Sequence, residues 1–306
     1  MDVRLGSGAG LAQVARAARV LWVRSRREAS GWLVGGFQSA FRGGGIEFEE
    51  SRPYAPGYDV RSIDWNALAR TGVPWVKRFR EERAQLVLIA LDASASMGFG
   101  TTGRTKLGVA AHAAALLAAA AARAGDPVGL VVFSDGVRAA LAPARGDAHG
   151  WRVVRAAAEW SERPGGRTRL AAALGWIGAH ARRRAIALVL SDFREAGRAP
   201  SELDLAGLAE RHDVVSIGVE DPRERELPAV GGVRLREAEG ASRAALGSGR
   251  AARARYAAAA RARRAALARR LRGQGAELVW LSTDADPLHA LHRFFAARGT
   301  RARVPR

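Results

Sequence analysis

The strongest constraint on the fold is an alternation of short apolar runs with longer alanine-rich stretches, which begins near residue 84 and continues almost to residue 297. Strands that are apolar on both faces and alternate with helices are typical of a parallel sheet covered on two sides. The apolar runs, of strand length, are residues 86–91, 128–133, 186–190, 214–219 and 278–281, and the predicted helices are residues 106–124, 147–160, 170–184, 201–211, 242–272 and 287–297. The sequence therefore predicts an α/β fold with a doubly wound, mostly parallel sheet and helices on both faces.

The rest of the chain divides by composition into shorter segments. Residues 1–45 contain a helical stretch at 11–27 followed by a glycine-rich part, and we interpret them as an N-terminal arm. Residues 46–83 mix aromatic and charged side chains between turn signals, and residues 75–82 alternate as a strand does. This segment is expected to pack on the main domain at 84–297, which a basic tail at 298–306 follows.

Charge alone favours an anionic partner, because the formal net charge is +19. The 49 basic residues include only Lys77 and Lys106 as lysines, so 49 − 2 = 47 are arginines, dispersed among abundant alanines as in proteins from GC-rich genomes. These arginines lack the interleaved aromatic side chains of a base-stacking platform. The densest block, at residues 250–272, fits a solvated helix face, and nucleic-acid binding stays an alternative.

Other features narrow the class of protein. The chain has no cysteine, which excludes disulfides and thiolate metal ligands. The richest apolar run, residues 109–122, is mostly alanine and contains His112, so it does not reach the length of about 18 uninterrupted apolar residues that indicates a membrane span. No secretory signal is recognisable near the N-terminus. We therefore expect a cytoplasmic protein without a membrane span.

Small polar side chains follow the first predicted buried strand. Asp92, Ser94 and Ser96 stand at alternate positions in the sequence LDASASMG directly after it. Ligands of parallel sheets bind at the carboxyl ends of the strands, near the point where the strand order reverses. One carboxylate and two hydroxyls form a partial shell for a hard cation such as Mg²⁺, which prefers about six oxygen ligands and keeps several waters.

Two later loops offer the missing ligands. Thr168 precedes a predicted helix, and Asp192 follows another buried strand in IALVLSDF. A parallel sheet would bring both beside the first loop. Each residue has an ordinary alternative role, because serines favour turns and Thr168 or Asp192 could cap a helix. The full set of Asp92, Ser94, Ser96, Thr168 and Asp192 predicts a site for Mg²⁺, or for Mn²⁺ or Ca²⁺.

This order of residues resembles the metal-ion-dependent adhesion site of von Willebrand factor A domains. A further resemblance covers most of the chain, to the bacterial family catalogued as domain of unknown function 58. The residues that carry it are Glu47-Phe48, Arg52, Tyr54, Gly57, Asp59, Arg61, Ile63-Asp64-Trp65, Ala69-Arg70, Val76-Lys77, Glu81-Glu82 and Asp92 to Met97, together with the C-terminal WLSTDADPLHALHRFFAAR. Tyr58 departs from the pattern, since an acidic residue is usual there.

The resemblance implies a von Willebrand factor A-like, Rossmann-like topology and a metal-dependent protein-binding module rather than an enzyme. A partner's aspartate or glutamate would bind the open position of the metal ion. Members of the family commonly occur beside MoxR-type AAA+ ATPases, which implies an adaptor for such a motor. For the cluster of Arg52, Asp59, Arg61, Asp64 and Trp65, a structural ion-pair network and a partner surface are both open.

Two enzyme classes compete with this interpretation. Residues 98–105, GFGTTGRT, approach the phosphate-binding loop GxxxxGK[ST], but Arg104 replaces the lysine and the strand ends at Asp92, too early for that motif. Carboxylates at strand ends also serve metal-dependent phosphoryl hydrolases. Such an enzyme needs a nucleophile and an acid, and neither Ser94 nor Ser96 has a basic neighbour in the sequence.

Overall fold

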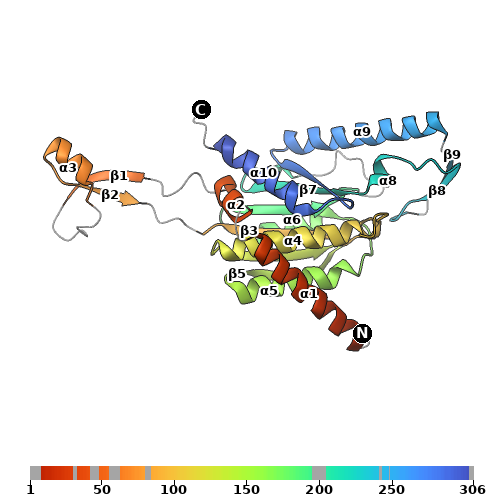
Figure 1. The fold of residues 1–306 in the computed structure, drawn as a ribbon, viewed down its shortest axis with the longest axis horizontal. Helices are drawn as coiled ribbons and strands as arrows, with labels where there is room; N and C mark the ends of the chain where they lie inside the picture. Colours follow the sequence, from red (N-terminus) through yellow and green to blue (C-terminus); the bar gives the residue numbers. More distant parts are fainter. Residues whose placement is uncertain are drawn as a thin grey trace.

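The central feature of the molecule is a six-stranded sheet with the strand order β10-β7-β6-β3-β4-β5 (Figure 1). The structure is a computed structural model and describes residues 8–29, 33–41, 48–54, 63–79, 84–194, 205–240, 243–247 and 249–302. The strands are β3 (Leu86–Asp92), β4 (Val128–Phe133), β5 (Val137–Ala144), β6 (Ala185–Ser191), β7 (Asp213–Glu220) and β10 (Glu277–Ser282). All neighbours pair in parallel except β5, which is antiparallel to β4. The predicted α/β fold with a mostly parallel sheet is confirmed.

The edge strand β5 is absent from the sequence prediction. Its sequence VRAALAPA alternates between exposed and half-buried positions and contains Pro143, which an edge strand tolerates because one side needs no ladder hydrogen bonds. By contrast, every residue of β3 and of β6 is buried. Continuous apolar runs therefore identified the five parallel strands, including β10 at the other edge, and could not identify the antiparallel edge strand β5.

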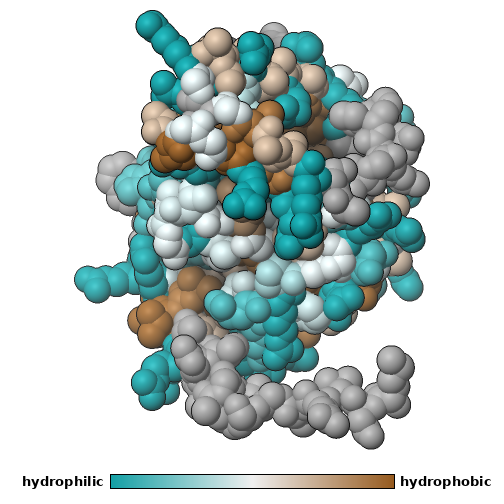
Figure 2. All heavy atoms as spheres, turned by 90° about the vertical axis from the view of Figure 1, so that its right-hand side faces the viewer, coloured by the Kyte–Doolittle hydropathy of each residue, from teal (hydrophilic) through white to brown (hydrophobic). Residues whose placement is uncertain are grey.

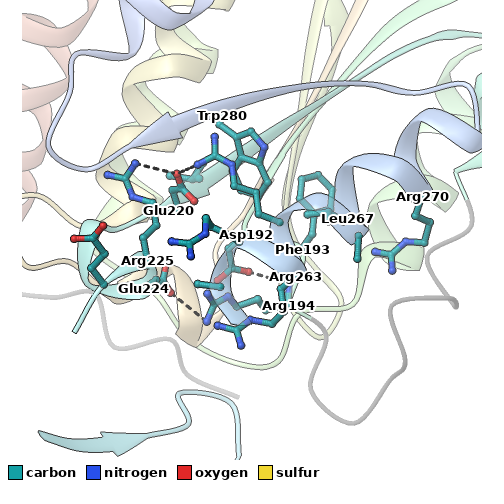
Figure 3. Close-up of a pocket in the computed structure, with 16 residues that line it drawn as sticks. Asp192, Phe193, Arg194, Glu220, Glu224, Arg225, Arg263, Leu267, Arg270 and Trp280 are labelled. Atoms are coloured by element: carbon teal, nitrogen blue, oxygen red, sulfur yellow. Dashed lines mark hydrogen bonds and ion pairs between the residues drawn. The ribbon is translucent and has the colours of Figure 1, made fainter. Parts of the chain in front are cut away.

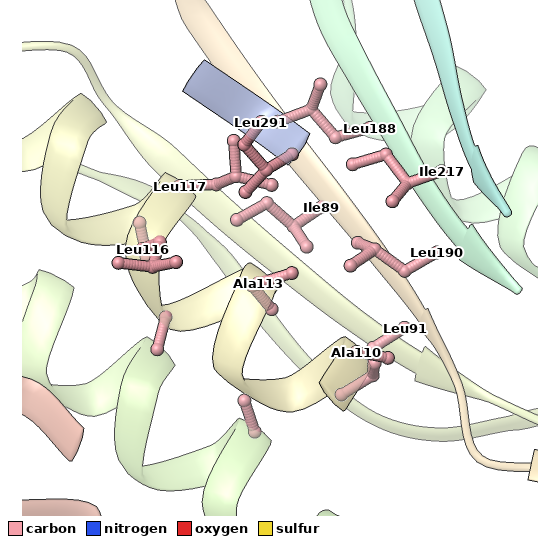
Figure 4. Close-up of a cluster of buried hydrophobic side chains, with 14 of the residues drawn as sticks. Ile89, Leu91, Ala110, Ala113, Leu116, Leu117, Leu188, Leu190, Ile217 and Leu291 are labelled. Atoms are coloured by element: carbon pink, nitrogen blue, oxygen red, sulfur yellow. The ribbon is translucent and has the colours of Figure 1, made fainter. Parts of the chain in front are cut away.

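Two groups of helices cover the two faces of the sheet. One buried cluster joins alternate residues of β3, β6 and β7 to α4 (Lys106–Arg123), α5 (Asp147–Ser161) and α10 (Pro287–Ala302). Figure 4 shows part of it, with Ile89 and Leu188 facing Leu117 and Leu291. The opposite residues of the strands pack on α6 (Leu170–His180), on α7 (Ala206–Ala209) and on Leu271 near the end of α9 (Arg250–Gly273).

Helix α4 is the most deeply buried helix of the first group. Alanines fill most of its length, and small side chains allow it to approach both the sheet and α5 closely. In the described part of the chain it is the one helix long and apolar enough to cross a membrane, and 78% of that window is buried inside the protein. Its apolar composition is thus explained by its place in the core.

The N-terminal part of the chain forms helices that pack against this same group. Helix α1 (Gly8–Glu28) includes the predicted helical stretch, and α2 (Val34–Phe41) lies against α10 (Figure 1). Phe37 is buried and contacts Phe41 and Phe295 with ring centroids 4.9 and 5.5 Å apart. Part of the segment that the sequence marks as glycine-rich is therefore helical, since Gly36 can lie directly against Phe295.

The family-motif segment forms a small antiparallel unit of β1 (Phe48–Pro53), β2 (Trp75–Phe79) and α3 (Trp65–Thr71), drawn apart from the six-stranded sheet in Figure 1. Asp64 accepts a hydrogen bond from the Ala67 amide at 3.2 Å and so caps α3, while Trp65 is 61% exposed. Asp59 and Arg61, and the side chain of Arg52, lie outside the described residues. The predicted ion-pair network and domain boundaries stay predictions.

Several helix boundaries differ from the sequence prediction. The stretch 242–272 is divided, because Arg243–Gly247 forms β9, the antiparallel partner of β8 (Gly232–Arg236), before α9 begins at Arg250. Within the stretch predicted at 201–211 the described helix is α7 alone, and residues 201–204 lie outside the description. Helix α10 continues past residue 297 to Ala302, where Arg298 forms an ion pair with Glu277 at 2.9 Å.

Candidate metal centre

The carboxyl ends of two neighbouring strands, β3 and β6, lie side by side at the centre of the sheet. Asp92 is the last residue of β3, and Ser191, the last residue of β6, donates a hydrogen bond from its hydroxyl to Asp92 Oδ2 at 2.6 Å. Both side chains are completely buried. The chain continues from β3 toward β4 on one side and reaches β6 on the other, so this is the point where the strand order reverses.

The loop after β3 directs three oxygen-bearing side chains to one place. The Ser94 amide donates to Asp92 Oδ1 at 2.9 Å, and a single turn of 3-10 helix, Ala95–Gly98, then brings Ser96 back. The hydroxyl oxygens of Ser94 and Ser96 lie 3.2 Å apart. The residues that stand at alternate positions in the sequence therefore lie close together in the fold.

Thr168 joins these residues from the loop between α5 and α6. Its hydroxyl donates to Ser94 Oγ at 2.9 Å. The two loops are held together by backbone bonds from Ala95 N to the Gly166 carbonyl at 3.0 Å and from Gly165 N to the Ala93 carbonyl at 2.8 Å. Gly166 has φ +77°, and a Cβ there would lie 2.9 Å from Ser134 Oγ, so glycine is required at this contact.

Asp192 completes the group of predicted residues. Burial and, after it, the negative charge of Asp192 together raise the pKa of the Asp92 carboxyl to about 7. The two carboxylates are therefore near enough to repel each other. The structure brings all five predicted residues together, four through hydrogen bonds and Asp192 through its charge, and every one of them is buried. Their role as metal ligands stays a prediction.

A buried lysine, Lys106, was missed by the sequence analysis. Its ammonium donates to Asp192 Oδ2 at 2.6 Å and to Glu224 Oε1 at 2.8 Å. Burial alone would lower the pKa of Lys106, but the charges of Asp192 and Glu224 outweigh burial and raise it. One signal was available in the sequence, because lysine occurs only at Lys106 and Lys77 in a chain with 47 arginines.

A glutamate from the β8–β9 hairpin also reaches the site. Glu239 accepts hydrogen bonds from the Thr168 hydroxyl at 2.7 Å and from the Thr168 amide at 2.8 Å, one with each carboxylate oxygen. This glutamate lies 71 residues beyond Thr168 in the sequence, in a turn between strands that the sequence did not predict. No pattern in the sequence could have identified it.

The chemistry of these residues fits a hard cation. All the donors are oxygen atoms, and the described residues contain no group of three or more His, Cys, Asp or Glu side chains placed to hold a metal ion. An ion here would thus depend on serine and threonine hydroxyls beside the carboxylates. Asp192 Oδ2 already accepts a hydrogen bond from Lys106. The other oxygen, Asp192 Oδ1, would therefore face an ion or a bridging water, and it also accepts a hydrogen bond from the Arg194 amide at 3.1 Å.

The loop that resembles a phosphate-binding motif uses its donors within the protein. The Thr101 amide and hydroxyl both donate to Asp221, at 2.8 and 2.6 Å, and Arg104 donates to the carbonyls of Thr283 and Ala285. Thr105 caps α4 through a bond from the Gly108 amide at 3.0 Å. The loop therefore connects the first strand of the site to the loop after β10.

A cavity of about 450 Å³ opens on the far side of Asp192, beneath α9 (Figure 3). Trp280 forms one wall, and Arg264 stacks on it with its guanidinium carbon 4.5 Å from the ring centroid while pairing with Glu220. Arg225 pairs with the same glutamate at 3.7 Å. Burial raises the pKa of Glu220 although the two arginines oppose this. Part of the arginine-rich helix is thus committed to ion pairs inside the protein.

Comparison with known proteins identifies the family. The sequence model of DUF58, described as a protein of unknown function, matches residues 50–266. The chain belongs to the DUF58 family. An uncharacterised protein of Mycobacterium tuberculosis strain H37Rv is 37% identical over 288 residues, which cover 94% of this chain and 90% of that protein. The predicted family resemblance is confirmed.

The solved structures similar to this DUF58 chain have low sequence identity to it. An aerotolerance-related membrane protein from Bacteroides fragilis is 16% identical, covers 71% of this chain and 100% of its own, and has a TM-score of 0.46. A von Willebrand factor type A protein from Catenulispora acidiphila is 16% identical, covers 74% of this chain and 44% of its own, and has a TM-score of 0.41. The predicted mostly parallel α/β fold is shown by the strand order of the sheet, and a von Willebrand factor type A protein is among the structures to which the chain is similar.

The predicted cytoplasmic location is contradicted by these similarities. The Bacteroides fragilis protein is described as a membrane protein. A structure from Vibrio fischeri, 18% identical over 70% of this chain and 98% of its own with a TM-score of 0.25, is described as a membrane spanning protein. The absence of a recognisable secretory signal or of an unbroken apolar run was therefore not a sound basis for assigning a location.

Proposed function

We propose that this DUF58 chain is a metal-dependent protein-binding module, an adaptor rather than an enzyme. The observation that carries the proposal is the cluster of Asp92, Ser94, Ser96 and Thr168, joined by hydrogen bonds beside the second buried carboxylate of Asp192. This is an all-oxygen donor set at the switch point of a parallel sheet. Mg²⁺ is the proposed cation, with Mn²⁺ or Ca²⁺ as alternatives.

Each residue has a defined task in this proposal. Asp92, Ser94 and Ser96 bind the cation directly, and Thr168 and Asp192 act directly or through water. Ser191 donates to Asp92 Oδ2 and fixes the orientation of that carboxylate. Lys106 neutralises part of the charge on Asp192, so the ion faces few full negative charges and stays electrophilic.

The proposed partner is a protein that presents an aspartate or glutamate. A carboxylate at the open position of the ion forms a charge-assisted bond where water otherwise binds. The net charge of +19 favours rapid encounter with acidic surfaces. By analogy with the gene neighbourhood of the family, we propose a MoxR-type AAA+ ATPase as the partner, with roles in protein assembly or maturation.

The hydrogen bonds of the serines support a binding role over hydrolysis. The hydroxyls of Ser94 and Ser96 are bonded to each other, and Ser94 also accepts from Thr168. Lys106, the buried amine nearest to Asp192, is held by two carboxylates. A serine nucleophile requires an activated base within hydrogen-bond reach, and among the described residues neither hydroxyl is bonded to an amine or an imidazole, which supports a binding role.

The test combines metal titration with partner binding. Isothermal titration with Mg²⁺ measures binding to the wild-type chain and to Asp92→Asn, with Asp135→Asn as the control, because Asp135 is an exposed aspartate after β4. Binding of the purified MoxR-type ATPase from the same genome is then measured in Mg²⁺ and in chelator. We expect Asp92→Asn or chelator to abolish both signals. Metal-indifferent recovery of the ATPase, or salt-sensitive binding of DNA or RNA in its place, would contradict the proposal.

A further inference from the structure

A groove of about 650 Å³ lies directly beside the candidate metal centre. It is bounded by the loop after β3, by α8 (Pro222–Arg225) and by the β8–β9 hairpin. Ser96 belongs to the centre and Glu239 contacts it. Both residues line the groove. Figure 2 looks onto this side of the molecule, where hydrophobic patches lie among mainly hydrophilic side chains. The groove is therefore continuous with the proposed metal site.

The lining combines an apolar surface with positive charge. Its apolar side chains are Phe99, Leu227, Pro228, Val233, Leu235 and Tyr256. Its arginines are Arg194, Arg223, Arg234 and Arg236, all of them exposed. Of the glutamates, Glu224 is paired with Lys106, which leaves Glu237 and Glu239 to face the groove. An apolar surface with a cationic rim is complementary to a segment that alternates acidic and apolar residues.

Glu239 marks the position of an acidic side chain at one end of the groove. Both of its carboxylate oxygens accept hydrogen bonds from Thr168, at 2.7 and 2.8 Å, and Thr168 is bonded in turn to Ser94. This glutamate belongs to the chain itself and approaches from the hairpin that forms one wall. A carboxylate from outside that binds an ion held beside Thr168 would approach the same place, so the two would compete.

We propose that the groove is the docking surface for an extended acidic segment of the partner protein, whose anchoring carboxylate replaces Glu239 at the metal centre. Further acidic residues of that segment pair with Arg223 or Arg236 along the rim. The inference rests on the proposed function, which supplies the metal ion. It adds the class of ligand, an acidic and apolar peptide, and a displacement of Glu239 that accompanies binding.

The experiment uses a short fluorescein-labelled peptide in which glutamate and leucine alternate, with a glutamine-for-glutamate peptide as the control probe. Fluorescence anisotropy measures binding to the full chain in Mg²⁺ and in chelator. Glu239→Gln removes the competing charge and is expected to raise the affinity about tenfold, whereas Glu237→Gln, in the same hairpin, raises it about twofold. Arg223→Gln and Arg236→Gln are each expected to lower it about fivefold, and Arg152→Gln, an exposed arginine of α5, leaves it unchanged.

Separate outcomes test the groove and the proposed function. If Mg²⁺ binds the chain by titration but the peptide does not bind, or binds equally to the Arg223, Arg236 and Arg152 variants, the groove is not the docking surface and the metal site stands. Equal affinities of Glu239→Gln and Glu237→Gln would overturn the displacement of Glu239. If Mg²⁺ itself does not bind, the proposed function fails, and the groove proposal fails with it.

Discussion

The two buried aspartates at the centre of the molecule have very different surroundings. Asp92 receives hydrogen bonds from neutral groups, the Ser191 hydroxyl and the Ser94 amide, and burial raises the pKa of its carboxyl to about 7. Asp192 has a full positive charge 2.6 Å away on Lys106. Within the part of the chain that the structure describes, one carboxylate thus has an internal cation as its partner and the other has none. This contrast indicates that Asp92 is where an external cation would gain most.

The largest expected effect comes from removing the internal cation. Lys106→Met leaves Asp192 buried without its ion-pair partner and leaves Glu224 paired with Arg194 alone, and breaking a buried ion pair in this way costs about 3–5 kcal/mol. Urea unfolding in chelator measures the free energy of unfolding. Arg123→Met, an exposed arginine in the last turn of the same helix, is the control and should change it by less than about 1 kcal/mol.

A second variant sharpens this comparison. Lys106→Met combined with Asp192→Asn removes both charges of the shorter ion pair, so it should recover part of the lost stability. If the double variant is as unstable as Lys106→Met alone, the cost arises from lost packing of the lysine side chain and not from an uncompensated charge on Asp192.

The parallel strands of the sheet were predictable because their signals are local. Strands β3, β4, β6, β7 and β10 are continuous apolar runs, and their length and spacing among helices determine a parallel arrangement. The β8–β9 hairpin was not predictable for the opposite reason. Its second strand, Arg243–Gly247, consists of arginine, alanine, leucine and glycine, the same residues that fill most of α9. Alanine and arginine at high frequency carry no period that separates a strand from a helix.

The next largest effect distinguishes the two aspartates by metal affinity. Asp92→Asn should weaken Mg²⁺ binding about 100-fold, equal to about 2.8 kcal/mol, because it removes the carboxylate that no cation among the described residues neutralises. Asp192→Asn should weaken it only about tenfold, since Lys106 already compensates that charge. Calorimetric titration of both variants checks the order. Equal losses, or a larger loss for Asp192→Asn, would mean that Asp192 is the main charged ligand.

The residues of the candidate site that directly follow the ends of strands were predictable. Asp92, Ser94 and Ser96 directly follow one buried run and Asp192 follows another, so the parallel sheet alone brings them near each other. Lys106 and Glu239 were missed because neither directly follows a predicted buried strand, and they reach the site from the start of α4 and from the β8–β9 hairpin. Whether a lysine at the start of α4 faces solvent or Asp192 depends on how α4 packs on the sheet, which no short stretch of sequence specifies.

The smallest expected effect concerns the neutral donor that holds Asp92. Ser191→Ala removes the hydroxyl that donates to Asp92 Oδ2 at 2.6 Å, and we expect this loss to lower metal affinity about tenfold, the low end of the range for such orienting groups. Ser216→Ala is the control, because the buried Ser216 hydroxyl in β7 has no hydrogen-bond partner among the described residues. Titration with Mg²⁺ should separate the two variants while their folds are unchanged by circular dichroism. If Ser191→Ala binds Mg²⁺ as tightly as Ser216→Ala, the orientation of Asp92 is fixed by the Ser94 amide and by packing, and the contrast between the two aspartates then lies in Lys106 alone.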